Sequence, residues 1–220
     1  MHMKTNQTDK AKDISTGVTK RKNSDLFKKN QLKIVKKATR LFMKQGYAQT
    51  SMRQIAKAAG IDLGNLYYFI KRKDEILFFT FDMLHSPAAE LFEKHNIFDI
   101  EEPEDQLRKA VRELVSINYD FKDEILLLYR ESKVLPKNFL KIIMERESRL
   151  VRHFEEILRK LAIKEDFNIP NPSFIANMIV YQSSLYPLRK WNLNECVKDT
   201  LMDCTEAYII NAIRRHGGRP

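Results

Sequence analysis

Apolar side chains recur at every third or fourth position almost throughout residues 26–214, and this spacing restricts the fold more than any other feature. It is the period of an α-helix with one buried face, whereas a half-buried strand needs apolar and polar residues to alternate. No stretch of the chain alternates over enough positions for a convincing strand. The 220 residues also suffice to bury a core without disulfides. The pattern predicts an all-α protein.

Glycines, prolines and capping residues divide this pattern into helices. Ser51 and Gln54 have the spacing of a capping box, and Gly60 can end the short helix that follows. Asp62 is a good N-cap for the next helix. Pro187 falls late in its helix and should kink it. We expect helices over residues 25–45, 51–59, 63–70, 73–94, 104–119, 121–133, 136–163, 172–190 and 194–214.

Positive charge is concentrated at the beginning of the chain. Residues 1–80 contain 18 basic and 6 acidic side chains, whereas residues 81–220 contain 21 basic and 23 acidic ones. Such a basic segment favours an acidic partner, either nucleic acid or an anionic membrane surface. No apolar run approaches the roughly 18 residues that would cross a bilayer, and the first residues lack the apolar core of a signal peptide. We therefore expect a cytoplasmic protein without a membrane partner.

Two short helices joined by residues 60–62, inside this basic segment, predict a helix-turn-helix. The second helix of such a motif enters the major groove, where Arg53 of the first helix can pair with guanine. Gly64 lets the backbone approach DNA, and Tyr67 and Tyr68 can bind phosphates or contact thymine methyl groups. The alternatives are that Tyr67 packs in the core and that Arg53 is a solvated surface charge. The charge and the motif together favour DNA binding.

The same residues closely resemble the tetracycline-repressor family of bacterial regulators in both order and spacing. The resemblance lies in the segments ATRLF (38–42), GY (46–47), TSMRQIA (50–56), AGID (59–62), GNLYYF (64–69) and KRKDEIL (71–77). It implies a homodimeric all-α regulator whose first three helices bind DNA and whose remaining helices bind a ligand and dimerise. This chain departs from the family pattern at Asp62, where many members have Ser or Thr, at Leu63, which is commonly polar, and at Phe69.

The resemblance also assigns DNA-facing positions, to which we add Lys71 as a phosphate contact. The positions that match are Ser51, Arg53, Leu63, Gly64, Asn65, Tyr67, Tyr68, Phe69 and Lys73. We divide the chain into a disordered basic arm (1–25), a helix-turn-helix domain (26–72), a ligand-binding and dimerisation domain (73–216) and a frayed tail (217–220). The arm, with Lys20, Arg21 and Lys22, either follows the minor groove or is merely solvated.

Polar groups inside apolar runs of the larger domain suggest a ligand pocket. The alternative is that these groups are core residues with satisfied hydrogen bonds. Residues 121–132 weakly resemble family members that respond to fatty acyl compounds, so an acyl-CoA or a fatty acid is one candidate effector of otherwise unknown identity. The expected lining is Phe79, Met83, Tyr119, Tyr129, Arg130, Phe154, Asn177, Met178 and Tyr181.

The last two helices have the length and apolar faces of a four-helix dimer interface, and the resemblance implies the same pairing. Cys196 and Cys204 lie in this region, match no zinc spacing and are expected to be buried thiols. The candidate interface residues are Phe174, Ile175, Ile179, Leu185, Val197, Leu201, Tyr208 and Ile209.

No motif favours an enzyme. The five histidines form no metal-binding or catalytic pattern, and His85 with Asp82 is expected to be a surface pair. The six glycines form neither a dinucleotide loop nor a phosphate loop. We therefore expect no catalytic residue, metal or cofactor.

These patterns predict a homodimeric repressor that a small, largely apolar effector releases from a palindromic operator. One alternative is an occlusion or architectural DNA-binding factor of the same fold without an effector. A basic membrane-surface protein is a further alternative, which the helix-turn-helix makes less favourable.

Overall fold

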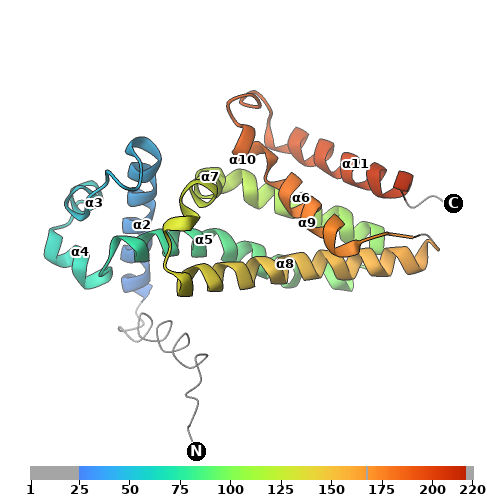
Figure 1. Ribbon diagram of the computed structural model, residues 1–220, viewed down its shortest axis with the longest axis horizontal. Coiled ribbons are helices and arrows are strands. Elements are labelled where there is room, and N and C mark those ends of the chain that lie inside the picture. The colour runs from blue at the N-terminus through green and yellow to red at the C-terminus, as the bar shows by residue number, and fades with distance from the viewer. Residues whose placement is uncertain (1–24, 167, 217–220) are drawn as a thin grey trace, which may run out of the picture. The chain divides into compact units, whose positions relative to one another are not determined.

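The computed structural model describes residues 25–166 and 168–216, and within them every regular element is a helix (Figure 1). The all-α prediction is confirmed. The basic arm expected before Asp25 and the tail expected after His216 lie outside the described residues.

The chain forms two compact units. Unit 1 contains residues up to Phe79 together with Val134–Phe139, and unit 2 contains Thr80–Lys133 and the chain from Leu140 onward. Helix α5 (Lys73–Lys94) therefore contributes to both units, although the sequence placed the domain boundary at its first residue. The segment Val134–Phe139 belongs to unit 1 because Phe139 stacks on Phe78 with ring centroids 4.5 Å apart.

Unit 1 is built from α2 (Asp25–Gln45), α3 (Met52–Ala59), α4 (Leu63–Phe69) and the beginning of α5. These bounds agree with the sequence prediction to within one residue. The apolar stripe of α2 packs on α3 and α4, because the spacing of apolar residues places them on inward faces. The buried side chains of this unit include Ile34, Val35, Ala38, Phe42, Ile55, Leu66 and Ile70.

The rest of the chain contains α6 (Pro103–Asp120), α7 (Lys122–Glu131), α8 (Lys137–Lys164), α9 (Pro172–Ser183), α10 (Leu185–Arg189) and α11 (Lys198–His216). Two 3-10 turns, η1 (Ile97–Asp99) and η2 (Ser132–Val134), lie between helices. The prediction of a single helix over residues 172–190 is wrong, because the helix is interrupted at Ser184, between α9 and α10. Pro187, the third residue of α10, needs no helical N–H there, because the first N–H groups of a helix have no partner within it. The last helix begins at Lys198 rather than at residue 194.

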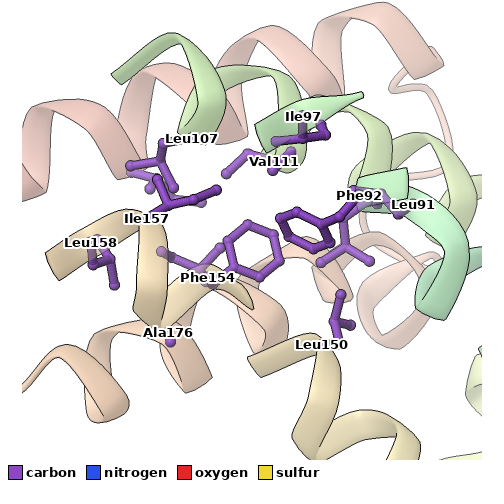
Figure 2. Close-up of a cluster of buried hydrophobic side chains, with 14 of the residues drawn as sticks. Leu91, Phe92, Ile97, Leu107, Val111, Leu150, Phe154, Ile157, Leu158 and Ala176 are labelled. Carbon is purple, nitrogen blue, oxygen red and sulfur yellow. The ribbon is translucent and has the colours of Figure 1, made fainter. Parts of the chain in front are cut away.

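The core of unit 2 lies among α5, α6, α8, α9 and α11 (Figure 2). Phe92 of α5 meets Phe154 of α8 edge to face, with ring centroids 5.4 Å apart. Phe154, which we expected to line a pocket, is fully buried in this core. The prediction that Phe154 lines a pocket is therefore wrong.

Ion pairs fasten α11 along α6. Arg112 of α6 binds Asp203 and Glu206 of α11 at 2.6 and 2.9 Å, and Arg214 of α11 binds Glu104 of α6 at 2.7 Å. These pairs run beside the buried apolar contact of the two helices, so they orient α11 without forming its core.

No helix within the described residues is long and apolar enough to cross a membrane. The prediction that both cysteines are buried is wrong. Cys204 is exposed and Cys196 is partly exposed, because Cys204 lies on the outward face of α11.

Candidate DNA-binding site and effector unit

The start of α3 is held by a complete capping box. The hydroxyl of Ser51 accepts a hydrogen bond from the backbone N–H of Gln54 at 3.3 Å, and the side chain of Gln54 accepts from the backbone N–H of Ser51 at 2.8 Å. The predicted box is therefore confirmed. Ser51 therefore stabilises the start of α3, at a position where the resemblance implies contact with DNA.

The turn between α3 and α4 depends on two backbone features. Gly60 adopts the left-handed conformation (φ +71°), which ends α3 at little cost for a glycine. Asp62 caps α4: its carboxylate accepts the backbone N–H of Asn65 at 2.8 Å and the side-chain amide of Asn65 at 2.6 Å. The bond from the Asn65 backbone is the main reason that the pKa of Asp62 is lowered. A Cβ on Gly64 would lie 3.1 Å from this carboxylate, so the glycine also makes room for the cap.

Three side chains of the helix-turn-helix remain turned to solvent. Arg53 of α3 is exposed, and no ion pair of the described residues involves it. Tyr67 and Tyr68 of α4 are 40% and 52% exposed, while Leu66 between the helices is fully buried. The alternative that Tyr67 packs in the core is thereby excluded. Tyr68 leans edge-on against Phe27 of α2, with ring centroids 5.9 Å apart, which restricts its ring.

Lys73 and Lys71 occupy different environments. The ammonium group of Lys73 donates to the backbone carbonyls of Tyr47, Ala48 and Thr50 at 2.8, 3.3 and 3.0 Å, and it lies 4.3 Å from the centre of the Tyr47 ring. It thus ties the first turn of α5 to the segment between α2 and α3. Lys71 is exposed. Sequence reasoning missed the role of Lys73, because the three carbonyls lie more than twenty residues away along the chain.

Positive charge covers much of this unit. Residues 25–79 contain twelve basic and four acidic side chains. Several of the basic groups project from α2 and were not among the predicted contacts, although their helical spacing could have revealed a basic face. The exposed lysines and arginine of α2 and α3 include Lys28, Lys29, Lys33, Lys36, Arg40 and Lys57.

A shallow cavity of about 240 Å³ lies in unit 1, with its floor at Ile34 and Ala59 and its rim at Asn30, Lys33 and Asn65. This volume is below the roughly 300 Å³ from which small-molecule sites begin. The predicted effector pocket was expected elsewhere, in the larger domain.

The residues expected to line that pocket are dispersed, all in unit 2 except Phe79. Tyr129 is half exposed, and its pKa is raised by burial and by nearby Glu147 and Tyr181. Arg130 and Asn177 are exposed, and the Asn177 amide donates to the backbone carbonyl of Ser173. The structure therefore brings Tyr129 close to Tyr181, on α7 and α9, and does not gather the whole set.

Three further members of the predicted pocket have other surroundings. Tyr119 stacks on Tyr186 with ring centroids 4.8 Å apart. Phe79 is the last α5 residue of unit 1, whereas Met83 belongs to unit 2, and both are partly buried. Met178 is 38% exposed.

An exposed apolar stripe runs along α9 into α10 and a second one along α11. Members of the first stripe are spaced by three or four residues, whereas members of the second are spaced by seven and four residues, beginning just before α11, so that each set recurs at roughly the helical period. Ile179 and Ile209, expected in the dimer interface, are 2% and 3% exposed and belong to the core, and Ile175 and Leu201 pack against that core. The stripe residues are Phe174, Met178, Tyr181 and Leu185, then Val197, Cys204 and Tyr208.

His85 of unit 2 is buried, although the sequence predicted a surface residue. It is 7% exposed, and its Nε2 atom has no hydrogen-bond partner among the described residues. Burial, and next the positive charge of Arg146, lower the pKa of His85 to about 4. The sequence predicted a surface pair because Asp82 and His85 are polar; Asp82 is partly exposed, whereas His85 lies at a buried position of α5.

A capped helix-turn-helix with exposed Arg53, Tyr67 and Tyr68, on a strongly basic unit, defines the chain as a DNA-binding protein of the helix-turn-helix class. Residues 34–78 match the family model of the bacterial regulatory proteins of the tetR family, and residues 101–184 match that of the tetracyclin repressor-like C-terminal domain. The chain belongs to the tetR family of bacterial transcriptional regulators.

Individual relatives agree with this assignment. The chain is 27% identical over 191 residues to the HTH-type transcriptional regulator HbdR of Aromatoleum sp. (strain CIB). The matched region covers 84% of this chain and 82% of HbdR. A tetR-family regulatory protein from Rhodococcus RHA1 has the same fold, with a TM-score of 0.76 at 20% identity over 87% of this chain and 99% of that one. AibR, solved in complex with isovaleryl coenzyme A and operator DNA, gives a TM-score of 0.65 at 22% identity over 81% of this chain and 97% of that one.

Proposed function

We propose that the protein is a homodimeric repressor that binds a pseudo-palindromic operator and leaves it when unit 2 binds a small, largely apolar effector. The observation that carries the proposal is that, in the helix-turn-helix, the residues that cap the helices are different from the exposed residues that can contact DNA. Ser51 caps α3, and Asp62, which the Asn65 amide binds, caps α4, whereas Arg53, Tyr67 and Tyr68 are exposed and can reach a ligand as large as DNA.

Each exposed group suits a different part of DNA. The guanidinium of Arg53 can bind guanine O6 and N7 together and thereby read sequence. The hydroxyl groups of Tyr67 and Tyr68 can bind phosphates, as can the exposed ammonium group of Lys71, and such contacts position the protein without reading bases. We assign Lys73 to positioning, because its protons already serve three carbonyls of its own chain. Ser51 contributes as the cap of α3, and Asn65 contributes through its hydrogen bonds to Asp62, the cap of α4, because backbone N–H groups at helix starts attract phosphates.

The exposed stripes of α9 and α11 support the dimer. They present large apolar side chains, with Tyr208 64% and Phe174 59% exposed, which a soluble monomer rarely gathers on one surface. Two helices from each of two copies would cover these stripes as a four-helix interface. A dimer also gives two recognition helices, which reach successive major grooves about 34 Å apart.

Helix α5 supports a coupling between effector and DNA. It is continuous from Lys73, which holds the segment before α3, to Lys94, and its residues Leu91 and Phe92 belong to the core of unit 2. An effector that binds one shape of the dimer better shifts the population toward that shape. A hundredfold loss of operator affinity requires about 2.7 kcal/mol of coupling.

The proposal is tested with an operator selected by the protein from a random DNA library. The full palindrome should compete much better than a single half-site, and binding should weaken steeply with salt through counterion release.

Arg53→Ala should lower the free energy of binding by on the order of 1–3 kcal/mol on the operator and by much less on random DNA. Lys57→Ala, which removes an exposed charge from the same helix, is the control. Equal competition by a half-site would reject the dimer, and equal losses on both DNAs would reject Arg53 as a reader of sequence.

A further inference from the structure

We infer that Asp82, His85 and Arg146 form the polar anchor of the effector site, and that this anchor takes an uncharged oxygen, such as the carbonyl of a ketone or an ester, on an otherwise apolar molecule. The inference rests on the proposed function, because it names the chemical class of the effector. All three residues lie in unit 2, on α5 and α8.

The three residues interrupt apolar stripes. Along α8, Arg146 stands between the buried residues Ile143 and Leu150 at spacings of three and four, where the helical period places another inward side chain. On α5, Asp82 and His85 are three residues apart and therefore lie on one face. The cluster therefore lies at the border of the apolar core, with His85 buried and with Asp82 and Arg146 partly exposed.

Arg146 and Asp82 neutralise one another. The Nη1 atom of Arg146 donates to the Oδ1 atom of Asp82, and the two side chains keep 31% and 33% of their surface exposed. The pair is therefore reachable from solvent. A guanidinium carries five N–H donors, and within the described residues Arg146 uses one of them for Asp82, so donors remain for a ligand.

His85 provides the unsatisfied group. It is more than nine-tenths buried, and its Nε2 atom lacks a partner in the described part of the chain. Buried polar atoms without partners are rare in native proteins, since their lost hydration is not replaced. An oxygen atom of a bound molecule would satisfy Nε2 in the tautomer that carries the proton there.

The charge balance selects the class of oxygen. The ion pair is neutral, and burial together with Arg146 keeps the pKa of His85 at about 4, so the imidazole is also neutral near pH 7. An uncharged carbonyl adds no charge to this neutral cluster. A carboxylate would add a negative charge to this cluster. It would have to displace Asp82 from Arg146 or require protonation of His85, because otherwise it would be a buried charge without a counterion.

The test uses octan-2-one and octanoate as probes that share a carbon chain and differ in charge. The ¹⁵N resonance of His85 Nε2 is followed in the full wild-type chain, so the measurement does not depend on a variant that folds. Octan-2-one should shift this resonance at a concentration at least tenfold lower than octanoate. A stronger response to octanoate would overturn the assignment of an uncharged ligand, and no response to either probe would show that the nitrogen faces no effector site.

Two histidine variants complete the test. His85→Phe should weaken octan-2-one binding at least tenfold, whereas His153→Phe should leave it unchanged, because His153 is partly exposed and packs on Phe92 and Phe98. Without a probe, both variants should bind the selected operator like the wild type. Loss of operator binding would count against the proposed function, and unchanged octan-2-one binding in His85→Phe would count against the anchor alone.

Discussion

Lys73 holds the backbone of Tyr47, Ala48 and Thr50, and in the proposed function it acts through this backbone rather than through its charge. Replacing it with Met should lower the free energy of unfolding by about 2 kcal/mol, since hydrogen bonds to charged groups contribute roughly 1.5–3 kcal/mol. Chemical denaturation measures this change. Lys71→Met, at an exposed position, should change stability by less than about 0.5 kcal/mol. Unchanged stability in Lys73→Met, with a weaker salt dependence of DNA binding, would instead make Lys73 a phosphate contact.

His85 should make the stability of the protein depend on pH. Its pKa falls from an ordinary value of 6.5 to about 4 in the folded chain, because burial and then Arg146 disfavour the charged form, while Asp82 opposes the shift. The unfolded chain therefore binds the proton first. The full stabilisation is present above pH 6.5 and is lost as the pH falls toward 4, by about 3 kcal/mol in total.

Denaturation of the wild type and of His85→Phe between pH 7 and 4 measures this contribution. The variant should lose less stability over the same interval. Parallel curves for the two proteins would show that His85 titrates normally.

At the scale of elements, the short α4 helix depends on its cap. Asp62→Ala removes an acceptor from the start of a seven-residue helix and should cost about 1 kcal/mol of stability and weaken operator binding. Asp62→Ser keeps an acceptor and removes a negative charge near DNA, so it should bind DNA at least as tightly as the wild type. Denaturation and operator titration of both variants separate the cap from the charge, and weaker DNA binding by Asp62→Ser would contradict this separation.

The helices of unit 1 could be predicted closely because their limits are local. A capping box, a left-handed glycine and an aspartate cap each act within four residues of the helix end that they define. The break at Ser184 was harder to predict, because a helix can continue past a proline with a kink or can stop before it. Neighbouring helices decide between these outcomes.

At the scale of the whole molecule, the apolar stripes of unit 2 should decide the oligomeric state. Phe174→Glu and Tyr208→Glu place a charge in the proposed interface and should raise the dimer dissociation constant on the order of 100-fold. Analytical ultracentrifugation measures this change. Ile163→Glu, at an 82% exposed residue of α8 outside the stripes, is the control and should remain dimeric. A wild-type chain that sediments as a monomer would reject the proposed interface.

The sequence by itself determined the all-α fold, the limits of the helix-turn-helix and its basic character, because helical periodicity, caps and charge are properties of neighbouring residues. It did not determine which face of a helix meets another helix. Ile179 and Ile209 proved to be core residues, Cys204 proved to be exposed, and His85 proved to be buried. Tertiary packing decided these four positions, because a helix with apolar side chains on more than one face can bury only the face that its neighbours cover.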